Sequence, residues 1–101
     1  MNNIQVLDFD WDAGNKDKCE KHGISSKEIE AFFKQESVYI APDIKHSEEE
    51  QRFLAIGRSV KGKPRFIAFT LRTKEGLLLI RPISARYMHD KEAKKYEEEN
   101  T

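Results

Sequence analysis

Nine lysine and arginine residues lie between Gln51 and Tyr87, against a single acidic residue, Glu75. The nine are Arg52, Arg58, Lys61, Lys63, Arg65, Arg72, Lys74, Arg81 and Arg86. This stretch therefore carries a charge of +8 in a chain of 101 residues whose net charge is zero. Because local field rather than net charge steers association, such a cluster is typical of a surface that binds a polyanion.

Two of these arginines are predicted to share one side of a β-hairpin. A four-residue loop over Thr73–Gly76 would set three cross-strand pairs: Arg72 with Leu77, Thr70 with Leu79, and Ala68 with Arg81. Since side chains alternate along a strand, Thr70, Arg72 and Arg81 would lie on the same side of the sheet. A guanidinium on a packed strand is preorganised to bind a phosphate through two hydrogen bonds. The alternative is that these arginines pair with surface carboxylates, as exposed charges commonly do.

Lys21 and His22 are candidates for proton transfer, at the predicted end of a short helix and just before Gly23. Metal-free RNA cleavage needs a base for the 2′-hydroxyl, cations for the crowded phosphorane and an acid for the leaving 5′-oxygen. A histidine pKa of about 6.5 suits the first or last role, and arginines suit the middle one. The alternative is that both side chains only interact with the negative end of the helix dipole.

The first third of the chain predicts a strand followed by two short helices. Leu7–Asp12 alternates strictly, which indicates a half-buried strand whose apolar residues face inward while Asp8 and Asp10 face solvent. Asp12 can cap a helix over about Ala13–His22, which Gly23 ends with a left-handed conformation. A capping box of Ser25 and Glu28 opens the second helix, with a buried stripe of Ile29, Phe32 and Phe33.

The rest of the chain predicts an antiparallel sheet of four further strands and a C-terminal helix. The strands are expected over Ser37–Ala41, Arg52–Ser59, Arg65–Arg72 and Leu77–Ala85, and the charged helix over His89–Asn100. The acidic stretch 43–50 is expected to be a solvated loop. Pro82 cannot donate a backbone hydrogen bond, so the last strand should lie at an edge or carry a bulge. A bulge would also move Arg86 to the side of the sheet that holds Arg81. The fold class is α+β.

Length and composition indicate one domain over residues 1–101, without a cofactor. Cys19 is the only cysteine, so no internal disulfide can form and a reducing compartment is expected. Asp8, Asp10 and Asp12 do not fit an EF-hand loop, and no histidine pair has zinc-ligand spacing, so no metal site is predicted. Neither a signal peptide nor a membrane span is visible, which favours the cytoplasm.

Several short sequence stretches, spread over about residues 7–98, form a pattern when they are taken in order. They are Phe9–Asp12 with Asn15 and Lys18, Lys21–Ser25, Asp43–Ser47, Glu50–Phe53 with Ile56–Arg58, Phe69–Arg72 and Arg81–Arg86, with Glu92 and Tyr96 near the end. In this order they resemble the BrnT family of toxins from type II toxin–antitoxin systems. Pro82 departs from the family's pattern, which usually has an aliphatic residue at that position.

The resemblance implies a RelE-like fold and a metal-independent endoribonuclease activity that halts translation and growth. It also implies neutralisation by a BrnA-like antitoxin with a ribbon-helix-helix DNA-binding part, so that the toxin would reach operator DNA only through its partner. Carried onto this sequence, the catalytic residues would be Lys21, His22, Arg72, Arg81 and Arg86, and the RNA-binding residues Arg52, Arg58 and Lys74.

A second function remains open from the sequence alone. The cationic sheet could belong to a non-catalytic interaction module that only binds an acidic segment of a partner protein. The two hypotheses differ in one observable, since only the first predicts that RNA is cleaved.

Overall fold

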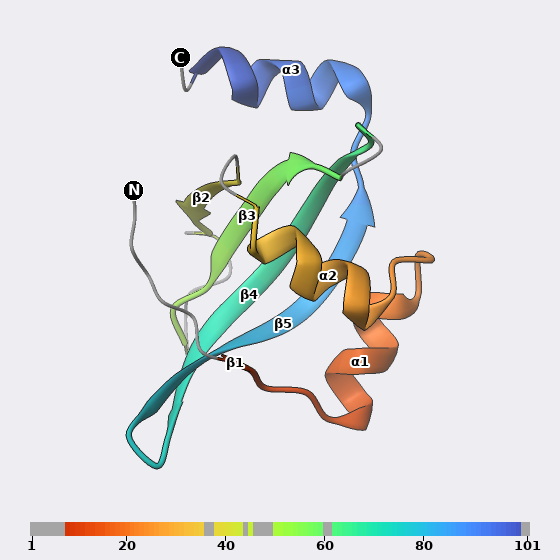
Figure 1. Ribbon diagram of the computed structural model, residues 1–101. Helices are drawn as coiled ribbons and strands as arrows, with labels where there is room; N and C mark the ends of the chain where they lie inside the picture. Colours follow the sequence, from red (N-terminus) through yellow and green to blue (C-terminus); the bar gives the residue numbers. More distant parts are fainter. Residues whose placement is uncertain (1–7, 36–37, 44, 46–49, 60–61, 100–101) are drawn as a thin grey trace.

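A computed structural model of the chain describes residues 8–35, 38–43, 45, 50–59 and 62–99 (Figure 1). Their elements, in chain order, are β1 (Asp8–Phe9), α1 (Ala13–Glu20), α2 (Ser26–Phe33), β2 (Tyr39–Pro42), β3 (Phe53–Arg58), β4 (Pro64–Lys74), β5 (Leu77–Tyr87) and α3 (Asp90–Glu99). The predicted α+β class, the two short helices and the C-terminal helix are confirmed. None of the described helices is long and apolar enough to cross a membrane.

The strands form one mixed sheet in the order β1-β5-β4-β3-β2. The strands β2 to β5 are antiparallel neighbours, as predicted, and β1 adds a short parallel strand along β5 through Asp8 and Phe9. In Figure 1, α2 crosses one face of the sheet, α1 lies beside β5, and α3 lies at the end of the sheet where β5 stops. The face covered by α2 is called the helix face below.

The core lies between α2 and the helix face. Ile29 and Phe32 of α2 are buried, as the predicted stripe requires, and they join a cluster with Ile67 and Phe69 of β4. Phe33 packs edge-on against Phe69, with ring centroids 5.0 Å apart. Burying a Phe or Ile side chain contributes about 1.5–3 kcal/mol, so these contacts hold α2 against the sheet.

Both predicted helix starts are confirmed. The Asp12 carboxylate accepts a hydrogen bond from the Asn15 backbone N–H, and Ser25 forms the predicted capping box with Glu28. The first helix ends at Glu20, two residues before the predicted end at His22, and a turn carries the chain to Gly23. Gly23 has φ +86°, the left-handed conformation expected there, which only glycine adopts without strain.

The first strand differs from its prediction in length and in the placement of one residue. It covers only Asp8–Phe9, and although Asp8 is exposed, Asp10 is buried with 8% of its surface exposed, contrary to the expected solvent-facing position. Phe9 and Trp11 pack against the core as predicted. Leu7, Ser37 and most of the predicted acidic loop at 43–50 lie outside the described residues.

Asn15 joins α1 to the sheet. Its buried side chain accepts from the Asp12 backbone N–H at 2.7 Å and donates to two backbone carbonyls, Asp10 at 2.9 Å and Pro82 at 2.8 Å. The start of α1, the end of β1 and the middle of β5 therefore depend on one amide group.

We predict that Asn15→Ala lowers the free energy of unfolding by about 2–4 kcal/mol, because it leaves buried backbone groups without partners. Urea denaturation followed by circular dichroism measures the change. Lys16→Ala, at the exposed neighbouring position of α1, is the control and should change stability by less than about 0.5 kcal/mol. Equal stabilities of the two variants would contradict the bridging role of Asn15.

Candidate active site

The hairpin of β4 and β5 has a tighter turn than the sequence predicted. Lys74 pairs with Leu77, so the loop is the two residues Glu75 and Gly76 and the predicted four-residue loop over Thr73–Gly76 is wrong. Glu75 has φ 52° and Gly76 has φ 79°, the positive values that a tight two-residue hairpin turn requires.

This turn shifts the register by two residues from the predicted one. Arg72 lies opposite Leu79, and Thr70 lies opposite Arg81. A shift of two keeps every side chain on its side of the sheet, because the side-chain period of a strand is two. The prediction that Thr70, Arg72 and Arg81 share one side is therefore confirmed despite the wrong pairing.

A β-bulge brings Arg86 to that same side. Pro82 lies opposite Phe69 and Ser84 lies opposite Ala68, so Ile83 is an extra residue in β5. After the bulge Arg86 lies opposite Phe66, and Phe66 shares its side of β4 with Thr70. Both predicted consequences of Pro82, the bulge and the change of side, are confirmed. We call the side of β4 and β5 that carries Arg72, Lys74, Arg81 and Arg86 the arginine face.

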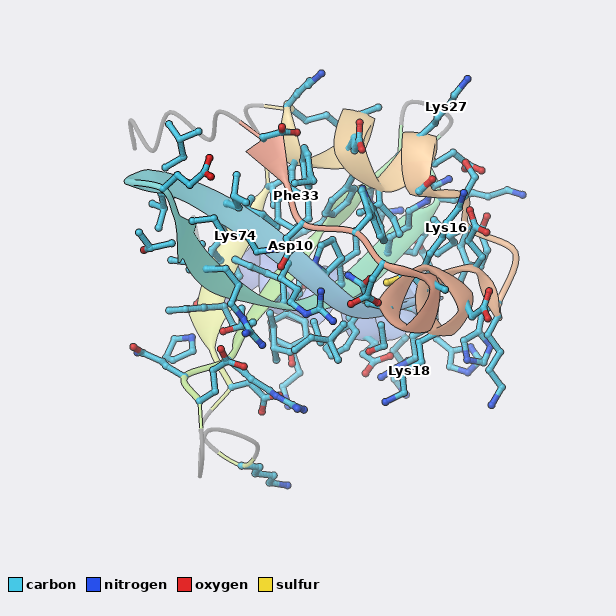
Figure 2. All side chains as sticks on the ribbon, turned by 90° about the horizontal axis from the view of Figure 1, so that it is seen from below. Asp10, Lys16, Lys18, Lys27, Phe33 and Lys74 are labelled. Atoms are coloured by element: carbon cyan, nitrogen blue, oxygen red, sulfur yellow. The ribbon has the colours of Figure 1, made fainter. Side chains whose placement is uncertain are left out.

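Two carboxylates hold the cations at the centre of the arginine face. Asp10 accepts hydrogen bonds from Lys74 Nζ at 2.8 Å and from Arg81 Nη1 at 3.4 Å (Figure 2). Asp12 accepts from Arg81 Nη2 at 2.8 Å through Oδ2, while its Oδ1 caps α1 through Asn15. Arg81 is thus fixed by the end of β1 and by the start of α1 together.

The electrostatics follow from these contacts. The hydrogen bond from Lys74 lowers the pKa of the Asp10 carboxyl below its usual 3.8, with Arg81 adding to the effect and burial opposing it. The Asn15 backbone N–H, followed by Arg81, lowers the pKa of Asp12. The hydrogen bond to Asp12 in turn raises the pKa of Arg81. At neutral pH the Asp10 and Asp12 carboxylates and the Arg81 guanidinium are therefore charged.

Arg72 and Arg86 occupy the outer parts of the arginine face. The exposed Arg72 forms an ion pair with Glu50, with Nε 3.0 Å from the carboxylate oxygen. The Arg86 guanidinium lies over the Phe66 ring, 4.7 Å from its centroid, and forms no ion pair with any described residue. Arg86 is therefore an exposed arginine with its charge available to an anion.

A family model described as "Ribonuclease toxin, BrnT, of type II toxin-antitoxin system" matches residues 11–92. The chain belongs to this family. Its substrate class is therefore RNA, and it acts as the toxin of a toxin–antitoxin pair. A comparison with curated proteins returned no match.

Two further cations were named from the BrnT resemblance, Arg52 and Arg58. Arg58, at the end of β3, donates to Asp90 at 2.9 Å and to Glu97 at 2.9 Å, so it fastens α3 to the sheet. These hydrogen bonds, the one to Glu97 first, raise the pKa of Arg58. Arg52 directly precedes β3 and is half-buried. The partners of Arg58 among the described residues therefore lie mainly on α3.

Lys21 and His22 are exposed in the turn after α1. Neither side chain forms a hydrogen bond or an ion pair with a described residue. Within the described residues no hydrogen bond joins Lys21 or His22 to the arginine face, and both side chains are accessible.

Sequence reasoning missed the carboxylates that orient the cations. Asp10 was considered only as a metal ligand or a solvent-facing residue, Asp12 only as a metal ligand or a helix cap, and Glu50 only as part of a loop and of the BrnT resemblance. The alternation of the first strand places Asp8 and Asp10 opposite the apolar residues, which could have indicated a place on the polar side of the sheet. The partners themselves are 64 and 71 residues away from Asp10, and no local pattern reports such contacts.

The lowered pKa of Asp10 predicts how the stability of the toxin depends on pH. The stabilisation is complete above the unfolded-state pKa of about 3.9 and is lost as the pH falls through the lower pKa of the folded state. We therefore expect Asp10→Asn to lose less stability than the wild type between about pH 5 and about pH 2. Thermal unfolding, followed at several pH values across this range, measures the loss of stability in each protein.

Asp17→Asn is the matched control, because Asp17 is an exposed carboxylate of α1 outside the network. It should keep the pH dependence of the wild type. Parallel stability curves for the wild type and Asp10→Asn would show that the buried carboxylate is not coupled to Lys74 and Arg81.

Proposed function

We propose that this toxin is a metal-independent endoribonuclease that binds the RNA backbone on the arginine face and thereby inhibits translation and growth. The observation that carries the proposal is the gathering of Arg72, Lys74, Arg81 and Arg86 on one side of the β4–β5 hairpin. Guanidinium groups on paired strands are preorganised for phosphate, because the sheet fixes their positions before the ligand arrives.

Arg72 of the arginine face is already paired with Glu50, yet this pair can exchange. Arg72 and Glu50 are 44% and 39% exposed, and an exposed ion pair contributes only about 0–1 kcal/mol. An RNA phosphodiester carries one negative charge on two non-bridging oxygens, as a carboxylate does, so it can replace Glu50 on the same guanidinium. A ligand can therefore displace Glu50 from Arg72 at little cost in free energy. Arg86 has no carboxylate to displace among the described residues.

The reaction we propose is an internal transfer within the RNA strand. The 2′-oxygen loses its proton to a base and bonds to the adjacent phosphorus, and the bond from phosphorus to the 5′-oxygen breaks. An acid protonates this leaving oxygen, which leaves a 2′,3′-cyclic phosphate and a 5′-hydroxyl end. Arg72, Arg81 and Arg86 would bind the phosphate oxygens as negative charge builds on them.

His22 and Lys21 would carry the proton transfers. Both side chains are exposed and unoccupied, as a group that meets the substrate must be. Hydrogen bonds of proton-transfer groups often form only in the complex with substrate, so the absence of a hydrogen bond between these side chains and Arg86 in the free toxin is compatible with this role. Arg52 and Lys74 would add contacts to the RNA backbone on either side of the cleaved bond, whereas Arg58, the third cation expected to bind RNA, stays paired with Asp90 and Glu97 of α3.

The same resemblance supplies the partner side of the proposal. A BrnA-like antitoxin, with a ribbon-helix-helix part, would neutralise the toxin by laying an acidic segment over the arginine face. Operator DNA would then be reached only through the antitoxin, and the complex would act in the cytoplasm. A RelE-like fold is part of this proposal, and the described α+β arrangement is compatible with it.

A second candidate function has one observation in its favour. Arg72, Lys74 and Arg81 each bind a carboxylate in the free chain, so the arginine face can accept the acidic side chains of a partner segment. A non-catalytic interaction module would bind such a partner tightly and cleave no RNA at any protein concentration.

We predict that Arg86→Ala lowers the cleavage rate by about 10²–10³-fold, the usual cost of removing one donor to a transition-state oxyanion. Single-turnover cleavage of a labelled RNA measures the rate. Lys91→Ala is the matched control, since Lys91 is an exposed cation on α3, away from the hairpin. An Arg86→Ala rate equal to that of Lys91→Ala would contradict the proposed site.

We also predict that excess EDTA leaves the cleavage rate unchanged, because the fixed arginines supply the charge that a metal ion provides in other nucleases. A magnesium-dependent nuclease in the same buffer serves as the control and should stop. A loss of activity that added Mg²⁺ restores would contradict metal independence.

A further inference from the structure

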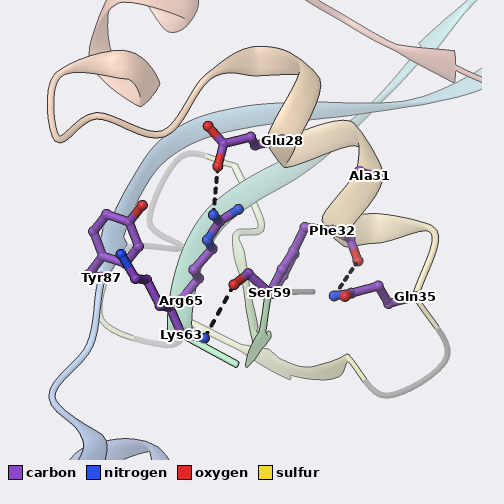
Figure 3. Close-up of a pocket in the computed structure, with 8 residues that line it drawn as sticks. All are labelled: Glu28, Ala31, Phe32, Gln35, Ser59, Lys63, Arg65 and Tyr87. Atoms are coloured by element: carbon purple, nitrogen blue, oxygen red, sulfur yellow. Dashed lines mark hydrogen bonds and ion pairs between the residues drawn. The ribbon is translucent and has the colours of Figure 1, made fainter. Parts of the chain in front are cut away.

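A polar cavity lies on the helix face, on the opposite side of the sheet from the arginine face (Figure 3). It has a volume of about 400 Å³ between α2 and the ends of β4 and β5. Its floor includes Arg65 and Tyr87, which are a directly opposed pair in the two strands. Their chain neighbours Phe66 and Arg86 form the next pair and lie on the arginine face.

Arg65 is a buried cation that uses little of its hydrogen-bonding capacity. Only 7% of the residue is exposed, and its Nη2 donates to Glu28 at 2.6 Å. Its Nε is shielded and has no hydrogen-bond partner in the described structure, and Nη2 is the only guanidinium nitrogen that makes a hydrogen bond there. Buried arginines normally satisfy more of their five donors than this, so the guanidinium retains capacity for a further acceptor.

Tyr87 presents an aromatic ring between two cations at the mouth of this cavity. The residue is 39% exposed, the Lys63 ammonium is 5.8 Å from its ring centroid, and the Arg65 guanidinium is 5.5 Å from it. In Figure 3 the Lys63 side chain extends toward the Tyr87 ring, and the Arg65 side chain extends toward Glu28. The lining contains two cations, Lys63 and Arg65, and one carboxylate, Glu28, so it has an excess of one positive charge.

The cavity wall also offers groups that suit a nucleobase. The amide nitrogen of Gln35 is engaged by the Phe32 and Arg58 carbonyls, at 3.4 and 3.0 Å, which fixes the amide and leaves its oxygen as an acceptor. Phe32 and Ala31 add apolar surface. An aromatic ring, cations and a fixed polar group in one hollow are the components of a site for single-stranded nucleic acid.

We propose that this cavity is a second binding subsite for the RNA strand, in which a base stacks on Tyr87 and its phosphate is bound by Lys63 and Arg65. The inference rests on the proposed function for the identity of the ligand. Arg86 and Tyr87 are consecutive, and their side chains lie on opposite sides of β5. The strand β1 pairs with β5 only at Leu79 and Ile80, so within the described residues no strand covers the edge of β5 at Tyr87. An RNA bound at Arg86 can pass this edge and reach the cavity.

The test measures binding with a short 2′-O-methyl RNA strand, which lacks the nucleophile and is not cleaved. Tyr87→Leu should weaken its affinity by about 5–150-fold, the range for losing one base–aromatic stack, and Tyr87→Phe should bind like the wild type. Lys63→Gln should reduce the slope of log affinity against log salt by about 0.7. Tyr39→Leu, at a tyrosine of similar exposure on β2, is the matched control and should have no effect.

Unchanged affinity in both Tyr87→Leu and Lys63→Gln, with weakened binding in Arg86→Ala, would overturn the subsite and leave the proposed function standing. Normal RNA affinity with lost antitoxin binding in these variants would also overturn it, in favour of a peptide site. If ordinary RNA is not cleaved but the uncleavable strand binds in a Tyr87-dependent way, the subsite stands and the proposed activity fails. No binding of RNA by the wild type would overturn both.

Discussion

One extra residue in β5 determines the side of the sheet on which Arg86 lies. Arg81 and Arg86 have an odd separation in sequence, so in a regular strand they would point to opposite sides. Pro82 has no amide hydrogen to donate to the ladder, and the strand accommodates it by leaving Ile83 unpaired. Without that bulge Arg86 would point toward the helix face, and the arginine face would lose the cation that forms no ion pair with a described residue. The residue that departs from the family's usual pattern therefore coincides with the feature that assembles the site.

The geometry of the arginine face also depends on the carboxylates that orient its cations. Asp10 is buried and Asp12 caps α1, so both acceptors are fixed by the fold and cannot follow a moving arginine. They hold Arg81 in place, whereas Glu50 holds Arg72 only through an exposed pair. This division suits a phosphate site, because Arg81 stays rigid while Arg72 can exchange its carboxylate for the ligand and Arg86 has none to displace among the described residues.

Local sequence signals were enough for much of the fold. The caps at Asp12 and Ser25, the glycine exit at Gly23 and the buried stripe of α2 involve residues a few positions apart, and all are present. The bulge followed from the chemistry of proline alone. The hairpin register failed because Glu75 adopts a positive φ, which is uncommon for a residue that is not glycine and which allowed a shorter turn.

The contacts that define the site could not be predicted in the same way. Asp10 meets Lys74 and Arg81 only because β1 joins the edge of β5 in parallel, and nothing in the sequence of a two-residue strand specifies that partner. The cavity around Arg65 arises from the packing of α2 across the ends of β4 and β5, which are far from α2 in the chain. Candidate site residues could be named from the resemblance, but the residues that contact them are known only from the three-dimensional structure.

The central claim is that the arginine face binds the RNA backbone through Arg72, Arg81 and Arg86. Nitrogen-15 NMR of the arginine Nε–H groups, during titration with an uncleavable RNA strand, tests it directly. The account predicts that the signals of these three arginines shift together and saturate at one RNA concentration, while the signal of Arg58, held by Asp90 and Glu97, stays in place. Shifts at Arg58 with unchanged signals from Arg81 and Arg86 would contradict it.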